Sequence, residues 1–249
     1  MGPFTTLTFR EDGDVATVVL SRPRTNMRMV RELTAVCDNL DDVSPCSAVV
    51  FRGDNGVFSE GMDFQEFRPD QPVDIHGFNK WEKLCVRIER LPKLTIAAIE
   101  GAAIGAGLQL ALVCDLRLAT PESVLQLDEV RKGFLPGMAT FRLAKSIGLG
   151  RAKRMMLTGA PLSAAEAVDI GILDEVCPSL DERVRALVQD LQPINTVAVQ
   201  LARRLLNESY STSFEDGIGN FLAAQHRACT QSAFIRTLEK AHDKPNDGN

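Results

Sequence analysis

The chain has 249 residues and a mass of 27.2 kDa, enough to bury one sizeable core with or without a smaller helical appendage. Its 45% hydrophobic and 24% charged residues are ordinary for a globular domain. A net charge of −5 and a pI of about 5.3 argue against nucleic acid or an anionic membrane as the main partner. The sequence shows neither the ~20-residue apolar run of a membrane span nor a signal-peptide pattern, so we expect a cytoplasmic protein with no membrane partner.

Cysteine and histidine spacing gives no sign of a metal site. None of the six cysteines forms a CxxC pair, and several fall within apolar periodic segments. A zinc site would need clustered partners, which His76, His226 and His242 do not provide. We therefore expect reduced thiols in the core and no bound metal.

The first quarter of the chain predicts the order strand, strand, helix, strand. Residues 7–12 and 14–21 have the pattern of an antiparallel hairpin. Apolar residues at helical spacing follow over 30–40, and Pro45 closes that segment. Residues 48–52 form a short apolar, β-branched run of the kind that is buried in a parallel sheet.

Loop and cap signals divide the middle of the chain. Residues 68–74 are rich in Pro and Asp and are typical of a surface loop. Residues 76–90 predict a long helix, which Pro92 stops. Further on, Ser163 and Glu166 have the spacing of a capping box, in which each side chain satisfies the other residue's backbone donor.

The central stretch, residues 95–120, combines an apolar strand, the small-residue loop GAAIGAG, the apolar helix LQLALV and a second strand. This order predicts a βαβ-like unit. Small residues at a helix start let a ligand approach free N–H groups at the positive end of the helix dipole. We infer a candidate oxyanion site at 105–107, and the alternative is that the small residues only allow close packing of helix and strand.

The last third of the chain predicts helices. After a short strand at 175–177, apolar periodicity marks four helical segments, at 181–191, 196–206, 214–229 and 233–242. We therefore expect an α/β core over residues 1–192 and a C-terminal helical subdomain over 193–249.

A second glycine loop resembles the central one in kind. The segment FSEGMDF ends a strand and begins a short helix, so the backbone amide of Met62 is a further candidate anion donor. Two independent N–H donors that converge on one carbonyl oxygen stabilise an enolate or a tetrahedral oxyanion.

Three ordered motifs give the chain a family resemblance. FSEGMDFQEF, IEGAAIGAGLQLALVCDLRLAT and DEVRKGFLPGMATFRLAKSIG, the last followed by RAKRMMLTG and AAEAVDIGILDEV, resemble the motifs of the crotonase (enoyl-CoA hydratase/isomerase) superfamily. The resemblance runs from the N-terminal strands to about residue 241. It implies the crotonase (ClpP-like) α/β fold, a spiral of ββα units, with C-terminal helices that build a homotrimer or a hexamer.

The resemblance also implies the substrate, a thioester of coenzyme A or of the phosphopantetheine of an acyl-carrier protein, with no separate cofactor. By position, the amides of Met62 and Ala106 would hold its carbonyl oxygen. Arg24 and Thr25 match a segment that lines the coenzyme A nucleotide, and the alternative for Arg24 is a solvated loop arginine. The other predicted substrate-binding residues are Glu60, Asp63, Gly105, Pro136 and Gly137, although Asp63 also suits a helix cap.

The acid/base positions depart from the family pattern. Hydratases of this family carry two glutamates, and the positions that match them are Gln109 and Glu129. Gln109 can orient a water or a substrate group, but it cannot accept a proton at neutral pH. The proton chemistry therefore falls to Glu129, for which the alternative is a surface carboxylate in the charged run DEVRK.

Two narrower resemblances lead to different reactions. Parts of the chain resemble the accessory crotonase-type protein of dihydroxyphenylacetyl-CoA formation, and KGFLPGMAT resembles the decarboxylases and dehydratases of polyketide β-branching. Both imply specialised metabolism. A decarboxylase would need only the oxyanion hole and one proton donor, for which His226 is a candidate, although a lone helical histidine is more often a surface residue.

We therefore expect an enzyme that acts on an acyl thioester through an enolate. Dehydration/hydration or double-bond isomerisation is the preferred reaction. Decarboxylation and a non-catalytic, thioester-binding accessory subunit are the alternatives.

Overall fold

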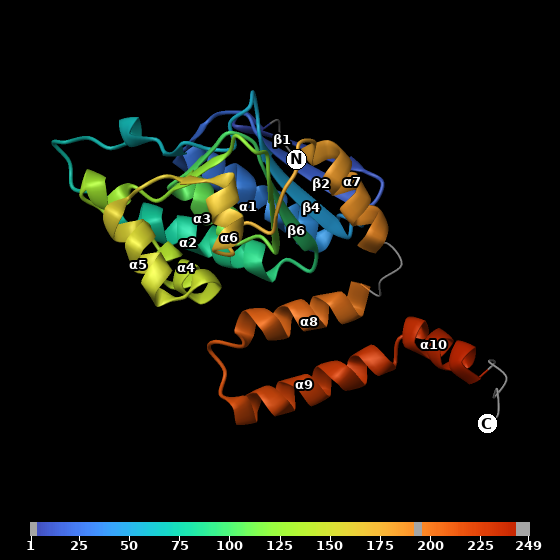
Figure 1. Ribbon diagram of the computed structural model, residues 1–249. Coiled ribbons are helices and arrows are strands. Elements are labelled where there is room, and N and C mark those ends of the chain that lie inside the picture. The colour runs from blue at the N-terminus through green and yellow to red at the C-terminus, as the bar shows by residue number, and fades with distance from the viewer. Residues whose placement is uncertain (1–3, 192–195, 243–249) are drawn as a thin grey trace. The chain divides into compact units, whose positions relative to one another are not determined.

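The structure is a computed structural model that describes residues 4–191 and 196–242 (Figure 1). It divides into two compact units, Met1–Gln189 and Asp190–Asn249. The predicted domain boundary at 192/193 lies outside the described residues, and the two units are described separately below.

The first unit is built on a six-stranded sheet with the order β1-β2-β4-β6-β8-β11. The hairpin β1–β2 is antiparallel, and every other pair in this sheet is parallel. The strands are β1 (Leu7–Asp12), β2 (Val15–Leu20), β4 (Ala48–Gly53), β6 (Leu94–Ile99), β8 (Leu116–Ala119) and β11 (Glu175–Val176). The predicted hairpin and the predicted βαβ-like unit, in which β6 pairs with β8, are confirmed.

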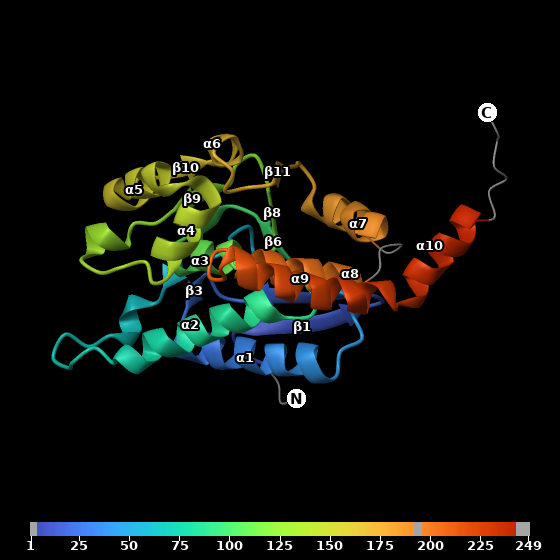
Figure 2. The same cartoon turned by 90° about the horizontal axis from the view of Figure 1, so that it is seen from below.

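Helices cover both faces of this sheet. On β4, Val49 and Phe51 pack into a core with helices α1 (Met27–Asp42) and α2 (Ile75–Arg90). The alternate residues Ala48 and Val50 face a second cluster that includes α7 (Leu180–Leu191). Figure 2 shows α1 and α2 on one side of the sheet and α7 on the other. The two-residue period of a strand explains why this segment is apolar throughout.

Helix caps account for differences between predicted and observed helix starts. The side chain of Asn26 accepts a hydrogen bond from the Met29 amide, so α1 begins before the first periodic apolar residue. Asp74 caps α2 in the same way. The capping box of Ser163 and Glu166 is present at the start of α6 (Ala164–Asp169), as predicted.

Two small sheets of short strands accompany the main sheet. Strand β7 (Ala102–Ile104) pairs with β9 (Val124–Gln126), which also pairs with β10 (Leu162–Ser163). Strand β3 (Arg24–Thr25) pairs with β5 (Gly61–Met62). The sequence predicts loops at β3, β5 and β7, and these interpretations were wrong because strands of two or three residues are too short to show a period.

Shorter helices complete the first unit. They are η1 (Phe64–Glu66), α3 (Ala106–Leu112), η2 (Glu129–Lys132), α4 (Ala139–Ile147) and α5 (Leu149–Thr158). The six cysteines have free thiols; five are buried, and Cys229 in the second unit is partly exposed.

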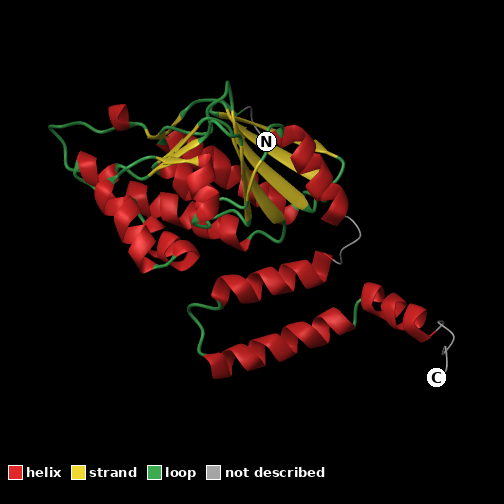
Figure 3. Ribbon diagram, viewed as in Figure 1, coloured by secondary structure: helices red, strands yellow, loops and turns green. Residues whose placement is uncertain are grey.

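The second unit is helical over its described residues (Figure 3). It contains α8 (Thr196–Glu208), α9 (Phe214–Cys229) and α10 (Ser232–His242), and Ser213 caps α9. Among the described helices of either unit, none has the length and apolar character required to cross a membrane.

The carboxylate of Glu32 on α1 anchors the segment before β1. It accepts hydrogen bonds of 2.6 to 3.1 Å from the amides and hydroxyls of Thr5 and Thr6. Burial alone would raise the pKa of Glu32, but these hydrogen bonds outweigh it and lower the pKa from 4.5 to about 2. A lowered pKa stabilises the folded chain at neutral pH, and this stabilisation is lost as the pH falls from 4.5 toward 2.

We predict that Glu32→Gln lowers the melting temperature at neutral pH and that the difference from wild type shrinks as the pH falls below 4.5. Thermal unfolding followed by circular dichroism across this range measures it. Glu122→Gln, at an exposed position, serves as the control and should match wild type at every pH. A deficit in Glu32→Gln that stays constant with pH would contradict the assignment.

Candidate active site

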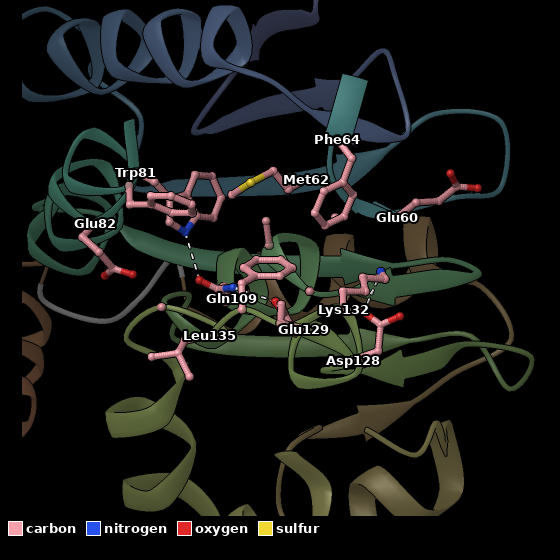
Figure 4. Close-up of a pocket in the computed structure, with 16 residues that line it drawn as sticks. Glu60, Met62, Phe64, Trp81, Glu82, Gln109, Asp128, Glu129, Lys132 and Leu135 are labelled. Atoms are coloured by element: carbon pink, nitrogen blue, oxygen red, sulfur yellow. Dashed lines mark hydrogen bonds and ion pairs between the residues drawn. The ribbon is translucent and has the colours of Figure 1, made fainter. Parts of the chain in front are cut away.

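A pocket in the first unit contains most of the candidate residues. It encloses about 460 Å³, part of it open to solvent. Its walls combine the two glycine loops, helix α2, the start of η2 and the segment before α4 (Figure 4). The lining residues are Glu60, Gly61, Met62, Phe64, Phe78, Trp81, Glu82, Gly105, Ala106, Gln109, Asp128, Glu129, Lys132, Phe134, Leu135 and Gly137.

The two glycine loops touch backbone to backbone. A Cβ on Gly61 would lie 2.9 Å from the carbonyl oxygen of Ile104 and 3.5 Å from the amide nitrogen of Ala106. Both Gly61 and Gly105 have positive φ, of 91° and 54°, which side chains disfavour. Gly107 packs just as closely on Ser59. Glycine is therefore required at these positions. The candidate amides belong to Met62 and Ala106, the residues that directly follow the two touching glycines, Gly61 and Gly105.

The amide of Ala106 lies at the start of α3. As the first residue of that helix, Ala106 has an N–H without an intrahelical acceptor, and Gly105 precedes it as the N-terminal cap residue. Ala106 is itself buried and lines the pocket. Its N–H is thus a candidate donor at the wall of the pocket.

The amide of Met62 is turned away from the strand that pairs with it. The next amide, that of Asp63, donates to the carbonyl of Thr25 on β3 at 2.8 Å. Successive N–H groups of an extended strand point to opposite sides, so the Met62 N–H points away from β3. The preceding residue, Gly61, contacts the start of α3, where a Cβ on it would lie 3.5 Å from the Ala106 amide nitrogen.

Glu129 begins η2 and its side chain is almost fully enclosed, with the residue 3% exposed. Its Oε1 accepts a hydrogen bond of 3.1 Å from Nε2 of Gln109. Its Oε2 is buried and has no hydrogen-bond partner among the described residues. Burial raises the pKa of Glu129, while hydrogen bonds from its own backbone and from Gln109 oppose the rise.

Gln109 links Glu129 to helix α2. Its Oε1 accepts a hydrogen bond of 3.0 Å from the indole Nε1 of Trp81, and Figure 4 shows the amide between the indole and the carboxylate. A Cβ on Gly137 would lie 2.9 Å from Gln109 Oε1, so the segment before α4 also closes over this amide.

The other acidic residues described in the pocket have cationic partners. Glu60 pairs with Arg24 at 3.1 Å, and Asp128 pairs with Lys132 at 2.8 Å. Glu82 accepts hydrogen bonds from the side chain of Arg142 and from the amide of Met138, both at 2.9 Å. Glu129 is therefore the carboxylate available to a ligand.

The remaining predicted binding residues have mostly structural contacts. Asp63 caps η1 through the Gln65 amide and pairs with Arg22 at 2.6 Å. Arg24 is half exposed in its pair with Glu60. Thr25 and Pro136 are buried and do not line the pocket. Binding roles for these residues stay predictions.

His226 lies on α9 of the second unit and is exposed, so its role as a proton donor also stays a prediction. The sequence does not mark Trp81 as a site residue. Trp81 has the helical spacing of core residues, and nothing in the sequence marks the hydrogen bond that its indole makes.

Comparison with known proteins shows the family of this chain. The family model for enoyl-CoA hydratase/isomerase matches residues 10–243. An enoyl-CoA hydratase of Amycolatopsis orientalis is 32% identical over 204 residues, which cover 82% of this chain and 90% of that protein.

Solved structures agree as well. The crystal structure of an enoyl-CoA hydratase from Bacillus anthracis has a TM-score of 0.89 at 25% identity and covers 96% of this chain and 97% of that one. A structure from Thermobifida fusca, in complex with acetoacetyl-CoA, has a TM-score of 0.80 at 28% identity and covers 90% and 94%. The predicted crotonase fold is confirmed, and the chain belongs to the enoyl-CoA hydratase/isomerase family, the crotonase superfamily.

Proposed function

We propose that this protein is an enzyme that binds an acyl-CoA thioester and moves a proton at the acyl chain through an enolate. The observation that carries the proposal is the free, buried Oε2 of Glu129 in a pocket that also contains two candidate amide donors. The complex of the Thermobifida fusca relative with acetoacetyl-CoA supports the substrate class. A carrier-protein thioester has the same reactive group and is the alternative substrate.

The backbone contact between the glycine loops supports an oxyanion hole. The amides of Met62 and Ala106 would donate to the thioester oxygen, where negative charge develops as the α proton leaves. Because the donors are backbone groups fixed by the fold, they would not have to reorganise during the reaction. The alanine at 106 does not weaken this arrangement, since its amide and not its side chain is the donor.

Glu129 would exchange the proton. As a carboxylate, it can accept the α proton through Oε2, and as the neutral acid it can return that proton to another carbon. A pKa raised by burial brings the two protonation states closer in free energy near neutral pH than in an exposed glutamate.

The fixed position of Gln109 favours chemistry with one carboxylate. Its Oε1 and Nε2 are both engaged, by Trp81 and by Glu129, and a carboxamide does not take up a proton. Double-bond isomerisation needs only one group that removes a proton and returns it at a different carbon. Dehydration/hydration is the second candidate, which the names of the relatives favour.

We infer a cytoplasmic enzyme of specialised metabolism that assembles as a homotrimer or a hexamer through its C-terminal helices.

The aromatic rings of Phe64, Phe78 and Phe134 line the pocket and would pack against a planar, unsaturated acyl group.

The reaction is tested by incubating the protein with 3-enoyl-, 3-hydroxyacyl- and carboxyacyl-CoA and following the products by mass spectrometry and ultraviolet absorption. We expect a 3-enoyl thioester to change its absorption at constant mass. Loss of water would assign dehydration, and loss of carbon dioxide would assign decarboxylation. Binding without any turnover would contradict an enzymatic role and favour the accessory one.

We expect Glu129→Gln to lower kcat at least ~100-fold, because the general acid/base is removed, while thioester binding is retained. Glu175→Gln, at a surface ion pair with Arg183, is the matched control and should keep wild-type rates. Turnover in Glu129→Gln close to wild type would reassign the proton transfer to another residue.

Glu129→Gln should also stabilise the fold at neutral pH. The raised pKa of Glu129 means that the folded chain holds this proton more tightly than the unfolded chain. The cost of the buried charge is therefore absent below the ordinary value of 4.5 and appears as the pH rises through the raised pKa. Thermal unfolding should show a higher melting temperature for the variant at neutral pH and equal values in acid. An unstabilised variant at neutral pH would contradict the buried, unpaired carboxylate.

A further inference from the structure

Trp81 is the only tryptophan in the chain, and it is buried in the wall of the pocket. It lies on the face of α2 that packs into the core, together with Leu84, Cys85 and Ile88. Its indole N–H nevertheless has a specific polar partner, Oε1 of Gln109 at 3.0 Å. Removing an aromatic core residue costs packing, so any further role has to be separated from packing by experiment.

The chemistry of the indole fixes the orientation of the Gln109 amide. An indole nitrogen only donates, so the atom of Gln109 that faces it has to be the carbonyl oxygen. The amide NH₂ group then points the other way, toward Oε1 of Glu129 at 3.1 Å. The reverse orientation would set two donors against each other at Trp81.

This orientation determines where Glu129 carries its proton. Because Gln109 donates to Oε1, this oxygen is an acceptor whether the carboxyl group is charged or neutral. A Cβ on Gly105 would lie only 3.0 Å from the same oxygen, so Oε1 is also closely enclosed. The proton of the neutral form consequently belongs on Oε2, the oxygen without a partner among the described residues.

We propose that Trp81 is a positioning residue, whose indole N–H holds the Gln109 amide so that Glu129 accepts and delivers its proton through Oε2. This inference rests on the proposed function for its catalytic consequence. The orientation of the amide follows from the hydrogen bonds alone and is tested independently of turnover.

Other charged groups near the carboxylate have defined partners. Asp128, the residue before η2, and Lys132, the last residue of η2, pair with each other. From α2, Glu82 pairs with Arg142 of α4. From the β5 side, Glu60 pairs with Arg24. These pairs lie in the same pocket region and contribute a background electrostatic field. The test therefore needs variants that change the relay, meaning the hydrogen bonds from Trp81 to Gln109 and from Gln109 to Glu129, and that leave the ion pairs intact.

The single indole provides the first measurement. In a ¹H–¹⁵N correlation spectrum, the side-chain N–H of Trp81 gives one resonance that needs no assignment. We expect its shift to titrate with a midpoint above 4.5, the ordinary value for glutamate, and this titration to vanish in Glu129→Gln. A resonance that does not move with pH, or moves identically in Glu129→Gln, would overturn the relay.

The second measurement separates positioning from packing by kinetics. Trp81→Phe keeps an aromatic ring and removes the N–H, so we expect kcat to fall about tenfold, the effect of one lost hydrogen bond, with KM nearly unchanged. Without an oriented donor to its charged form, Glu129 should titrate higher, so the acidic limb of kcat should move to higher pH.

Two further variants complete the test. Gln109→Met should reproduce the effects of Trp81→Phe, and the double variant should be no worse than either single one, because both remove the same interaction. Phe51→Leu, a fully buried change on β4 outside the pocket, is the control for lost packing. It should lower the melting temperature without moving the acidic limb.

The outcomes separate the two proposals. Independent effects of Trp81→Phe and Gln109→Met, or a Trp81→Phe profile that matches Phe51→Leu, would overturn the positioning role. A titrating indole in a protein that turns over no thioester would uphold the orientation of Gln109 and overturn the proposed function and, with it, any catalytic consequence. If turnover depends on Glu129 but the indole resonance does not titrate, the proposed function is upheld and the positioning role of Trp81 is overturned.

Discussion

Gly61 and Gly105 meet without side chains between them, and the arrangement of the pocket depends on this contact. Each has a positive φ that disfavours a side chain, and a Cβ on Gly61 would collide with the carbonyl oxygen of Ile104. The close approach sets the start of α3 beside β5, so the Ala106 amide and the outward Met62 amide come from neighbouring loops. It also leaves room for the Glu129 carboxylate against Gly105. The donors and the acid/base group are thus held by backbone geometry rather than by flexible side chains.

The buried carboxylate of Glu129 is the electrostatic counterpart of that contact. A carboxylate 3% exposed, with one oxygen unpartnered among the described residues, is unfavourable for the fold, and burial raises its pKa accordingly. Gln109 compensates one oxygen only. The unpaired carboxylate lowers the stability of the fold but leaves one oxygen available for the proposed proton transfer. The other described pocket carboxylates are neutralised by Arg24, Arg142 and Lys132.

Elements with a clear period or cap could be predicted from the sequence, and short-range details could not. The hairpin of β1 and β2, the apolar strand β4 and the capping box at Ser163 follow from local patterns, and each is present. Strands β3, β5 and β7 are too short for a pattern, although they position both amides. Two separate family motifs identified Gln109 and Glu129, which lie 20 positions apart and are hydrogen-bonded in the pocket. Trp81 was missed because its helical spacing predicts that its ring packs in the core but predicts no partner for its indole N–H.

Glu129 and the two backbone amides would together form an enolate from a bound thioester, whatever the later fate of that enolate. Exchange of the α protons of an acyl-CoA with D₂O, followed by ¹H NMR, measures this step without depending on the final product. We predict that the wild-type protein catalyses exchange, that Glu129→Gln does not, and that Glu175→Gln exchanges at the wild-type rate. Exchange that persists in Glu129→Gln, or a wild-type protein that binds the thioester without exchanging its α protons, would contradict the account.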